Sequence, residues 1–257
     1  MNRFVKPLVS TASTAGATGS SHTDGNYNYL DVRYSESARP YTEYPGLLTE
    51  HLTREYLAGY RGSKLLDLGS GRGEFLHGFA RQGFDAQGVD RSRPSAPRFL
   101  EPVIEADYER AGLPFGAAEF SVLFSKSVFE HIADIGSLLR ECHRVLSPTG
   151  RMIALVPDWT AQWRHFYDDW THVRPFTLNG LSECIACHGF DVKEALRFRQ
   201  LPVLWSHPYL KPLADAAALL PRPFKKSKFV RFSKEWMLLV VADKQSVVES
   251  AAPAPMK

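Results

Sequence analysis

The stretch Asp67-Leu-Gly-Ser-Gly-Arg-Gly-Glu74 decides the fold of this 257-residue chain. It begins inside the short apolar run Lys64–Leu68, which has the length and composition of a buried strand. Glycines at positions 69, 71 and 73 permit a positive φ and let a ligand approach the main chain closely. We expect a helix to follow as far as about Gln82, with its first amide groups facing the ligand. The sequence therefore predicts a strand, a binding loop and a helix in succession.

Strands and helices alternate along the chain around this loop. Leucines at 47, 48, 52 and 57 have helical spacing, and further strands are expected at residues 84–90, 103–106, 120–124 and 152–156. An amphipathic helix is predicted from the stripe Ile135, Leu138, Leu139, Cys142, Val145 and Leu146, and Pro148 and Gly150 should end it. Two prolines in residues 91–99 leave room only for a short or broken helix. Because parallel strands need crossover helices, the pattern predicts an α/β fold with helices on both faces of a mostly parallel sheet.

The glycine spacing argues against a dinucleotide. A G-x-G-x-x-G loop would need its third glycine at position 74, where this chain has Glu74. A carboxylate at that point would repel a pyrophosphate, so the loop suits a cationic or zwitterionic ligand better.

Later segments support a more specific interpretation. The loop resembles the first motif of class I S-adenosylmethionine-dependent methyltransferases, and Gly88-Val-Asp90, Ala106-Asp107-Tyr108 and Val128-Phe-Glu-His-Ile132 resemble later motifs of that family in the same order. The resemblance runs from about Lys64 to Pro157, with a looser likeness near Asp243. It implies a Rossmann-like, mostly parallel seven-stranded sheet whose last strand is antiparallel.

The same resemblance implies S-adenosyl-L-methionine as the cofactor. Asp90 would hold both ribose hydroxyls, and Asp107 would face the adenine amino group. Framework roles remain open: Asp67 would then brace the loop, Asp90 and Asp107 would be ordinary turn acids, and Tyr108 would pack at the edge of the core. The cofactor-binding candidates are Asp67, Gly69, Ser70, Gly71, Gly73, Asp90, Asp107, Tyr108 and Ser125.

We expect the residues that bind the methyl acceptor to follow the fourth and fifth strands. The pattern D-x-x-H-x-R-x-F-T at residues 169–177 resembles a subgroup of methyltransferases that act on small molecules and glycans. A catalytic base is needed only where the methyl acceptor loses a proton. The alternative to a catalytic role for this loop is a structural latch, in which its side chains bond only to each other and to the main chain. We do not expect a metal site here. The catalytic candidates are His172, His131 and Asp169, and the candidate substrate ligands are Arg174 and Glu130.

Composition limits the other functions. A net charge of +3 gives no reason to expect nucleic-acid binding, and no apolar run approaches the roughly 20 residues that span a bilayer. Three cysteines are too few for a disulfide framework, which favours a cytoplasmic location.

The domain itself is expected to run from residue 27 to 245. Residues 1–26 are predicted to be a disordered leader and residues 246–257 a disordered tail. Residues 201–232 resemble a lid-like insertion that mixes apolar and basic side chains, so we expect at most weak peripheral contact with a membrane. The tyrosine-rich residues 27–45 are expected to close over the cofactor as a second lid.

The predicted function is S-adenosylmethionine-dependent methyl transfer, with a hydroxyl of a small molecule, sugar or glycan as the expected acceptor. Alignment of the nucleophile with the methyl carbon would supply most of the catalysis. One alternative is a catalytically silent subunit that binds the cofactor. Another is a nicotinamide-dependent oxidoreductase, which the glycine spacing and the lack of a recognisable Tyr-x-x-x-Lys pair disfavour. The sequence predicts neither the identity of the acceptor nor the oligomeric state.

Overall fold

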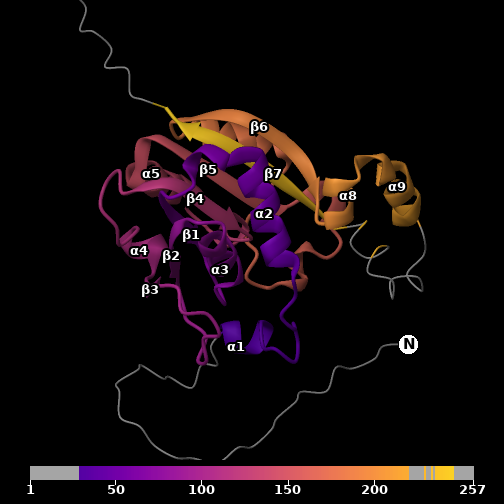
Figure 1. Cartoon of the computed structure of the whole chain (residues 1–257), viewed down its shortest axis with the longest axis horizontal. Coiled ribbons are helices and arrows are strands. Elements are labelled where there is room, and N and C mark those ends of the chain that lie inside the picture. Colours follow the sequence, from indigo (N-terminus) through magenta and orange to yellow (C-terminus); the bar gives the residue numbers. More distant parts are fainter. Residues whose placement is uncertain (1–28, 220–228, 230–232, 234, 246–257) are drawn as a thin grey trace, which may run out of the picture.

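A computed structural model of the chain describes residues 29–219, 229, 233 and 235–245. Its centre is a seven-stranded sheet in the order β3-β2-β1-β4-β5-β7-β6 (Figure 1). The first five strands are parallel, and β7 is antiparallel to both β5 and β6, so the predicted fold class is confirmed. The strands are β1 (Lys64–Leu68), β2 (Asp85–Asp90), β3 (Val103–Glu105), β4 (Phe120–Lys126), β5 (Leu146–Pro157), β6 (Phe190–Arg199) and β7 (Trp236–Lys244).

Helices cover both faces of this sheet (Figure 1). The core on one face includes side chains of α2 and α3, and the core on the other includes side chains of α5 and α7. The α-helices are α1 (Tyr29–Arg33), α2 (Tyr44–Tyr56), α3 (Glu74–Arg81), α4 (Tyr108–Ala111), α5 (Ile135–Val145), α6 (Trp159–Gln162), α7 (Leu178–Ala186), α8 (Pro202–Ser206) and α9 (Lys211–Leu219). The 3-10 helices are η1 (Ala58–Tyr60), η2 (Phe129–His131), η3 (Phe166–Asp168) and η4 (Pro208–Leu210).

Alternation along β1 shows why its leucines pack on both faces of the sheet. Leu65 packs in the core beneath α2 and α3, whereas Leu66 and Leu68 pack in the core beneath α5 and α7. Successive side chains of a strand point to opposite faces, so a strand covered on both faces carries apolar residues at neighbouring positions. The polar residues are left for the strand ends, where the loops form the site.

The fifth strand is longer than the sequence predicted. We expected residues 152–156, but β5 begins at Leu146, directly after α5, and therefore includes Pro148 and Gly150. The pairing of β4 with β5 shifts register between Phe120 and Val122. Proline is tolerated at such an irregularity because no regular ladder hydrogen bond is lost there.

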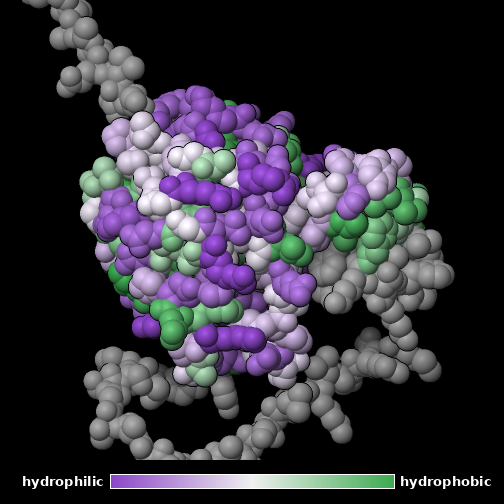
Figure 2. Space-filling model, in the orientation of Figure 1, coloured by the Kyte–Doolittle hydropathy of each residue, from purple (hydrophilic) through white to green (hydrophobic). Residues whose placement is uncertain are grey.

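The segment between β6 and β7 forms α8, η4 and α9 in its described part and protrudes beside the sheet (Figure 1). Trp205 of α8 stacks on His51 of α2 with ring centroids 4.8 Å apart, and Arg199 of β6 holds Asp215 of α9 at 2.7 Å. Figure 2 shows hydrophobic side chains gathered on the surface of this segment. Leu213 and Leu219 of α9 are exposed, as is Tyr209 of η4. Its function as a lid remains a prediction.

The predicted leader and tail, residues 1–26 and 246–257, lie outside the described residues, as does most of the basic part of the insertion. Within the described residues, no helix combines the length and the apolar character that crossing a bilayer requires.

Candidate active site

The glycine loop and the end of β2 meet at the carboxyl edge of the sheet. The Gly71 amide donates a hydrogen bond to Asp90 Oδ2 at 2.8 Å, and the Ser92 amide donates to Asp90 Oδ1 at 3.1 Å. Burial raises the pKa of the Asp90 carboxyl, and these backbone hydrogen bonds oppose that shift. Gly69, Gly71 and Gly73 all adopt positive φ, at 74°, 54° and 81°. The structure thus brings the predicted loop and the predicted ribose-binding carboxylate into direct contact.

Gly69 and Gly71 have different reasons to be glycine. A Cβ atom at Gly69 would lie 2.2 Å from Val128 Cγ2, so this glycine allows the loop to pack against the end of β4. A Cβ atom at Gly71 would meet nothing within 4 Å. The open side of Gly71, next to the Asp90 carboxylate, is where a ligand has room.

Several buried polar atoms near the strand ends lack a hydrogen-bond partner among the described residues. Such an atom costs roughly 1–3 kcal/mol when it stays unpaired, so a polar ligand is favoured here. S-adenosylmethionine carries hydroxyl, amine and ammonium groups that can donate hydrogen bonds. The unpartnered oxygens at the strand ends can accept such bonds, so the residues present fit this cofactor. The atoms are Asp67 Oδ2, Ser70 Oγ, Asp107 Oδ1 and both carboxylate oxygens of Glu130.

Other predicted cofactor residues have framework contacts. Burial, followed by the charge of Asp90, raises the pKa of Asp67 to about 8. Tyr108 is 5% exposed and packs in the core with residues of β1 and β2. Ser125 Oγ donates to the Leu68 carbonyl at 3.3 Å and so links β4 to β1. Asp107, by contrast, is half-buried beside the end of β3, with its Oδ1 3.7 Å from Arg91 Nε, and its contact with adenine stays a prediction.

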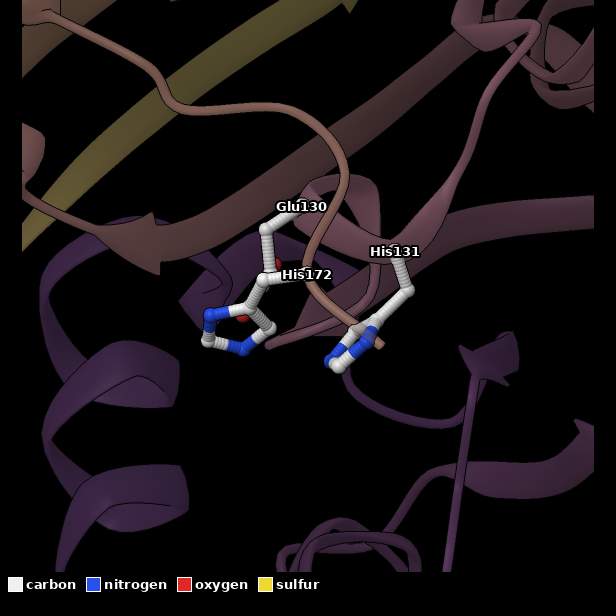
Figure 3. Close-up of side chains that lie close together, drawn as sticks. All are labelled: Glu130, His131 and His172. Atoms are coloured by element: carbon white, nitrogen blue, oxygen red, sulfur yellow. The ribbon is translucent and has the colours of Figure 1, made fainter. Parts of the chain in front are cut away.

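A second group of side chains gathers at the ends of β4 and β5. Glu130 and His131 belong to η2, which follows β4, and His172 lies in the loop that follows η3; Figure 3 shows the three side chains together. One potential ligand atom from each lies within 4.8 Å of the others, a donor set of the kind that can hold a divalent cation. Glu130 is 1% exposed, and burial raises the pKa of its carboxyl to about 8 even though Lys126 lies nearby.

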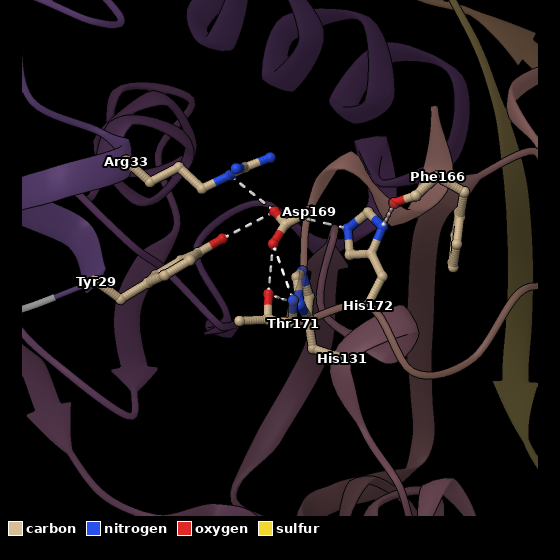
Figure 4. Close-up of polar contacts among 7 residues, drawn as sticks. All are labelled: Tyr29, Arg33, His131, Phe166, Asp169, Thr171 and His172. Carbon is tan, nitrogen blue, oxygen red and sulfur yellow. Dashed lines mark hydrogen bonds and ion pairs between the residues drawn. The ribbon is translucent and has the colours of Figure 1, made fainter. Parts of the chain in front are cut away.

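Hydrogen bonds determine which nitrogen of each imidazole is free (Figure 4). His172 Nδ1 lies 2.7 Å from the Phe166 carbonyl, which only accepts, so Nδ1 carries the proton and Nε2 keeps its lone pair. The Thr171 hydroxyl donates to Asp169 Oδ1 at 2.7 Å. Its oxygen, 2.9 Å from His131 Nδ1, therefore accepts from that nitrogen, which leaves Nε2 of His131 unprotonated as well.

The pKa shifts of the two histidines and Asp169 agree with this hydrogen-bond pattern. Burial, reinforced by His172, lowers the pKa of His131 to about 4, and burial also lowers the pKa of His172. Burial alone would raise the pKa of Asp169, but hydrogen bonds from Thr171 and the charge of Arg33 more than offset it, so the pKa lies below its ordinary value. The site thus presents two neutral imidazoles beside an ionised carboxylate, with Asp169 Oδ2 3.9 Å from His172 Nε2.

The short helix α1 closes over this group (Figure 4). The Tyr29 hydroxyl donates to Asp169 Oδ2 at 3.1 Å, and Arg33 Nε lies 2.8 Å from the same oxygen. Arg72 of the glycine loop donates to the Tyr34 and Arg39 carbonyls, both at 2.8 Å. The sequence indicated a lid over residues 27–45 from its tyrosines, but no periodicity or motif marked Tyr29 and Arg33 individually.

Arg174, a predicted substrate ligand, contacts main-chain carbonyls. Its guanidinium donates to the Ile132 carbonyl at 3.4 Å and to the Ala133 carbonyl at 2.5 Å. Two further hydrogen bonds run from the amides of Val173 and Arg174 to the Glu130 carbonyl, at 2.9 and 3.0 Å. Arg174 therefore ties the loop after β5 to the loop after β4, and its role as a substrate ligand stays a prediction.

Solved structures share this arrangement of sheet and helices. One is a methyltransferase of Haloferax volcanii in complex with the Trm112 activator, with a TM-score of 0.62, 18% identity and coverage of 85% of this chain and 95% of that one. Another is the Burkholderia thailandensis 1,6-didemethyltoxoflavin-N1-methyltransferase, solved with S-adenosylhomocysteine, with a TM-score of 0.56, 19% identity and coverage of 84% and 85%. The fold is that of the class I S-adenosylmethionine-dependent methyltransferases.

The chain belongs to the family described as "Methyltransferase domain", whose model matches residues 41–195. Curated relatives include the ubiquinone biosynthesis O-methyltransferase of Caulobacter sp. strain K31, which is 37% identical over 102 residues. That of Rhodopseudomonas palustris strain TIE-1 is 27% identical over 119 residues. The matches cover 37% and 43% of this chain, and the chain spans only 40% and 45% of the length of these relatives.

Proposed function

We propose that the protein transfers a methyl group from S-adenosylmethionine to a hydroxyl oxygen of a small molecule or sugar. The observation that supports this most directly is the hydrogen bond between the Gly71 amide and Asp90, which lies at the same edge of the sheet as the unprotonated nitrogens of His131 and His172. The relatives named for O-methylation favour oxygen over nitrogen or carbon. The glycine spacing and the family disfavour the oxidoreductase alternative.

The cofactor subsite is formed by the ends of β1, β2 and β3. Asp90 accepts hydrogen bonds from the ribose hydroxyls, Asp107 accepts from the adenine amine, and the open side of Gly71 receives the nucleoside. Asp67, Gly69, Ser70, Gly73, Tyr108 and Ser125 shape this subsite. When bound, S-adenosylmethionine supplies an electrophilic methyl group on its sulfonium sulfur.

The acceptor subsite removes the proton of the attacking hydroxyl. His172 Nε2 has its lone pair available because Nδ1 donates to the Phe166 carbonyl. As Nε2 takes up the proton, the ionised Asp169 carboxylate at 3.9 Å stabilises the imidazolium. His131 Nε2 accepts a second hydrogen bond from the acceptor and Glu130 borders it, while α1 excludes water from above.

Binding and transfer should be measured separately. Calorimetry with S-adenosylhomocysteine tests the cofactor subsite, and transfer of a tritiated methyl group to a panel of phenols, sugars and glycans tests the reaction. We expect Asp90→Ala to abolish binding, whereas His172→Ala should retain binding and lower turnover by about 10²–10⁴-fold.

Two outcomes would contradict the proposal in different ways. If the wild-type protein does not bind S-adenosylhomocysteine, a methyltransferase function is excluded altogether. If the protein binds S-adenosylhomocysteine but transfers no methyl group to any hydroxyl acceptor, the result would instead favour a catalytically silent subunit that only binds the cofactor.

The outer surface of η4 and α9 supports weak contact with a membrane. Exposed Tyr209, Leu213 and Leu219 precede in sequence the segment 225–234, which is rich in lysine and arginine. Sedimentation with anionic and with zwitterionic vesicles tests this contact. If the protein sediments with neither kind of vesicle, the proposed membrane contact is wrong. A cytoplasmic location and the absence of a nucleic-acid partner remain predictions.

A further inference from the structure

Lys126 lies at the centre of the carboxyl edge of the sheet. Leu68 pairs with Ser125 in the parallel register of β1 and β4, so the next residues, Gly69 and Lys126, are neighbours at the two strand ends. Ser127 then adopts a positive φ of 58°, and the chain turns sharply away. Lys126 is therefore fixed beside the glycine loop, opposite in position to Asp90 across β1.

The Lys126 ammonium is partly buried and lacks a hydrogen-bonding partner in the part of the chain that the structure describes. Its Nζ lies 5.4 Å from the centre of the Phe75 ring at the start of α3. Glu74, one of the acids that surround it, already binds Arg72 at 2.8 Å. Burial lowers the pKa of Lys126 to about 8, and Arg39 adds a further positive charge, although Glu130 opposes the shift. A buried cation in this state is stabilised by an anion that reaches it.

The strand order indicates which part of the cofactor lies there. The adenine and ribose contacts proposed above are on β3 and β2, and β1 and β4 follow in that order. Adjacent strands are about 4.8 Å apart, so the end of β4 is about 10 Å from the end of β2. A nucleoside held by Asp90 must therefore extend its amino-acid chain across Gly69 toward Lys126.

We infer that Lys126 binds the carboxylate of the methionine part of S-adenosylmethionine and so positions the methyl group above the end of β4. This inference rests on the proposed function, because it assumes that Asp90 holds the ribose. Lys126 acts as a binding and positioning residue, and it takes no part in proton transfer.

Two ligands that differ in this part of the molecule test the inference. S-adenosylhomocysteine has the carboxylate, and methylthioadenosine lacks the whole amino-acid part. We expect Lys126→Met to weaken binding of S-adenosylhomocysteine by about tenfold or more and to leave methylthioadenosine binding within about twofold of wild type. Lys193→Met, which removes an exposed lysine from β6, is the control and should change neither.

A thermal melt of the ligand-free variant separates binding from a framework role. Because Lys126→Met removes a partly buried ammonium that has no hydrogen-bonding partner among the described residues, its melting temperature should equal or exceed that of the wild type. Equal loss of affinity for both ligands, or no loss for either, would overturn the inference while leaving the proposed function intact. If wild-type protein binds neither ligand, the proposed function fails and this inference fails with it.

Discussion

Asp67 is buried beneath the glycine loop, and one of its carboxylate oxygens has no hydrogen-bond partner among the residues that the structure describes. Its pKa of about 8 in the folded state lies above the ordinary aspartate value of 3.8, so folding favours the protonated form. The associated stability is fully present below about pH 4 and is lost as the pH rises toward 8. Asp67→Asn should therefore match wild type near pH 4 and exceed its stability by about 1–3 kcal/mol at pH 8.

Urea denaturation of the ligand-free protein between these pH values measures the difference. Asp85→Asn, which changes an exposed carboxylate at the start of β2, is the control and should show no such trend. An Asp67→Asn variant less stable than wild type at pH 8 would show that the ionised carboxylate braces the loop.

Gly69 and Gly71 should respond differently to the same substitution. Alanine at either position adopts an unfavourable positive φ, which costs about 1–2 kcal/mol. At Gly69 the new methyl group also collides with Val128, which should add about 1–3 kcal/mol. Gly71→Ala meets no neighbouring atom, so its loss of stability should be limited to the cost of the positive φ, and its methyl group beside Asp90 should weaken S-adenosylhomocysteine binding. Denaturation and calorimetry on both variants decide this, and the opposite ranking in stability would contradict the packing described for the loop.

The cluster of Glu130, His131 and His172 should act without a metal ion. The charge of Lys126 acts on Glu130 and that of Arg33 on His131, and both oppose uptake of a dication. We expect turnover to be unchanged after exhaustive treatment with a chelator. Loss of turnover that returns with a divalent cation would instead assign these three side chains as ligands.

Among the elements, α1 should control access to the acceptor. It has five residues and only Leu30 is buried, so its contacts with Asp169 hold much of it in place. The double variant Tyr29→Phe and Arg33→Met should raise the KM for the acceptor about tenfold with little change in stability. Steady-state kinetics measure the KM, and the rate of limited proteolysis at sites preceding α2 reports how firmly α1 is held. Arg54→Met on α2 is the control. Unchanged kinetics would mean that α1 is only a surface helix.

How much could be predicted also differs between elements. Strands β1 and β4 were predictable because short apolar runs end in polar residues, and the loop that joins β1 to α3 carries its own glycines. The start of β5 was missed because Pro148 and Gly150 usually end regular structure. The approach of His131 to His172 depends on how two loops 40 residues apart meet, as the hydrogen bond between Thr171 and His131 shows. No local pattern contains that information.

At the scale of the molecule, the sheet should unfold as one unit. Val240 of β7 is fully buried and pairs with Ala154 of β5 and Ala195 of β6. Val240→Ala should lower the free energy of unfolding by about 1–3 kcal/mol through the cavity it leaves. Far-UV circular dichroism and tryptophan fluorescence should then report the same transition. Two separate transitions would show that the cofactor half and the β6–β7 half unfold independently.

The position of β7 between β5 and β6 also constrains biosynthesis. Both neighbours leave the ribosome before it, yet neither can complete its ladder until β7 inserts between them. A nascent chain therefore carries two unpaired edges, and the last strand to emerge closes them. Such long-range pairing is slow and exposed to aggregation, so a chaperone that shields β5 and β6 during translation should raise the yield of native protein.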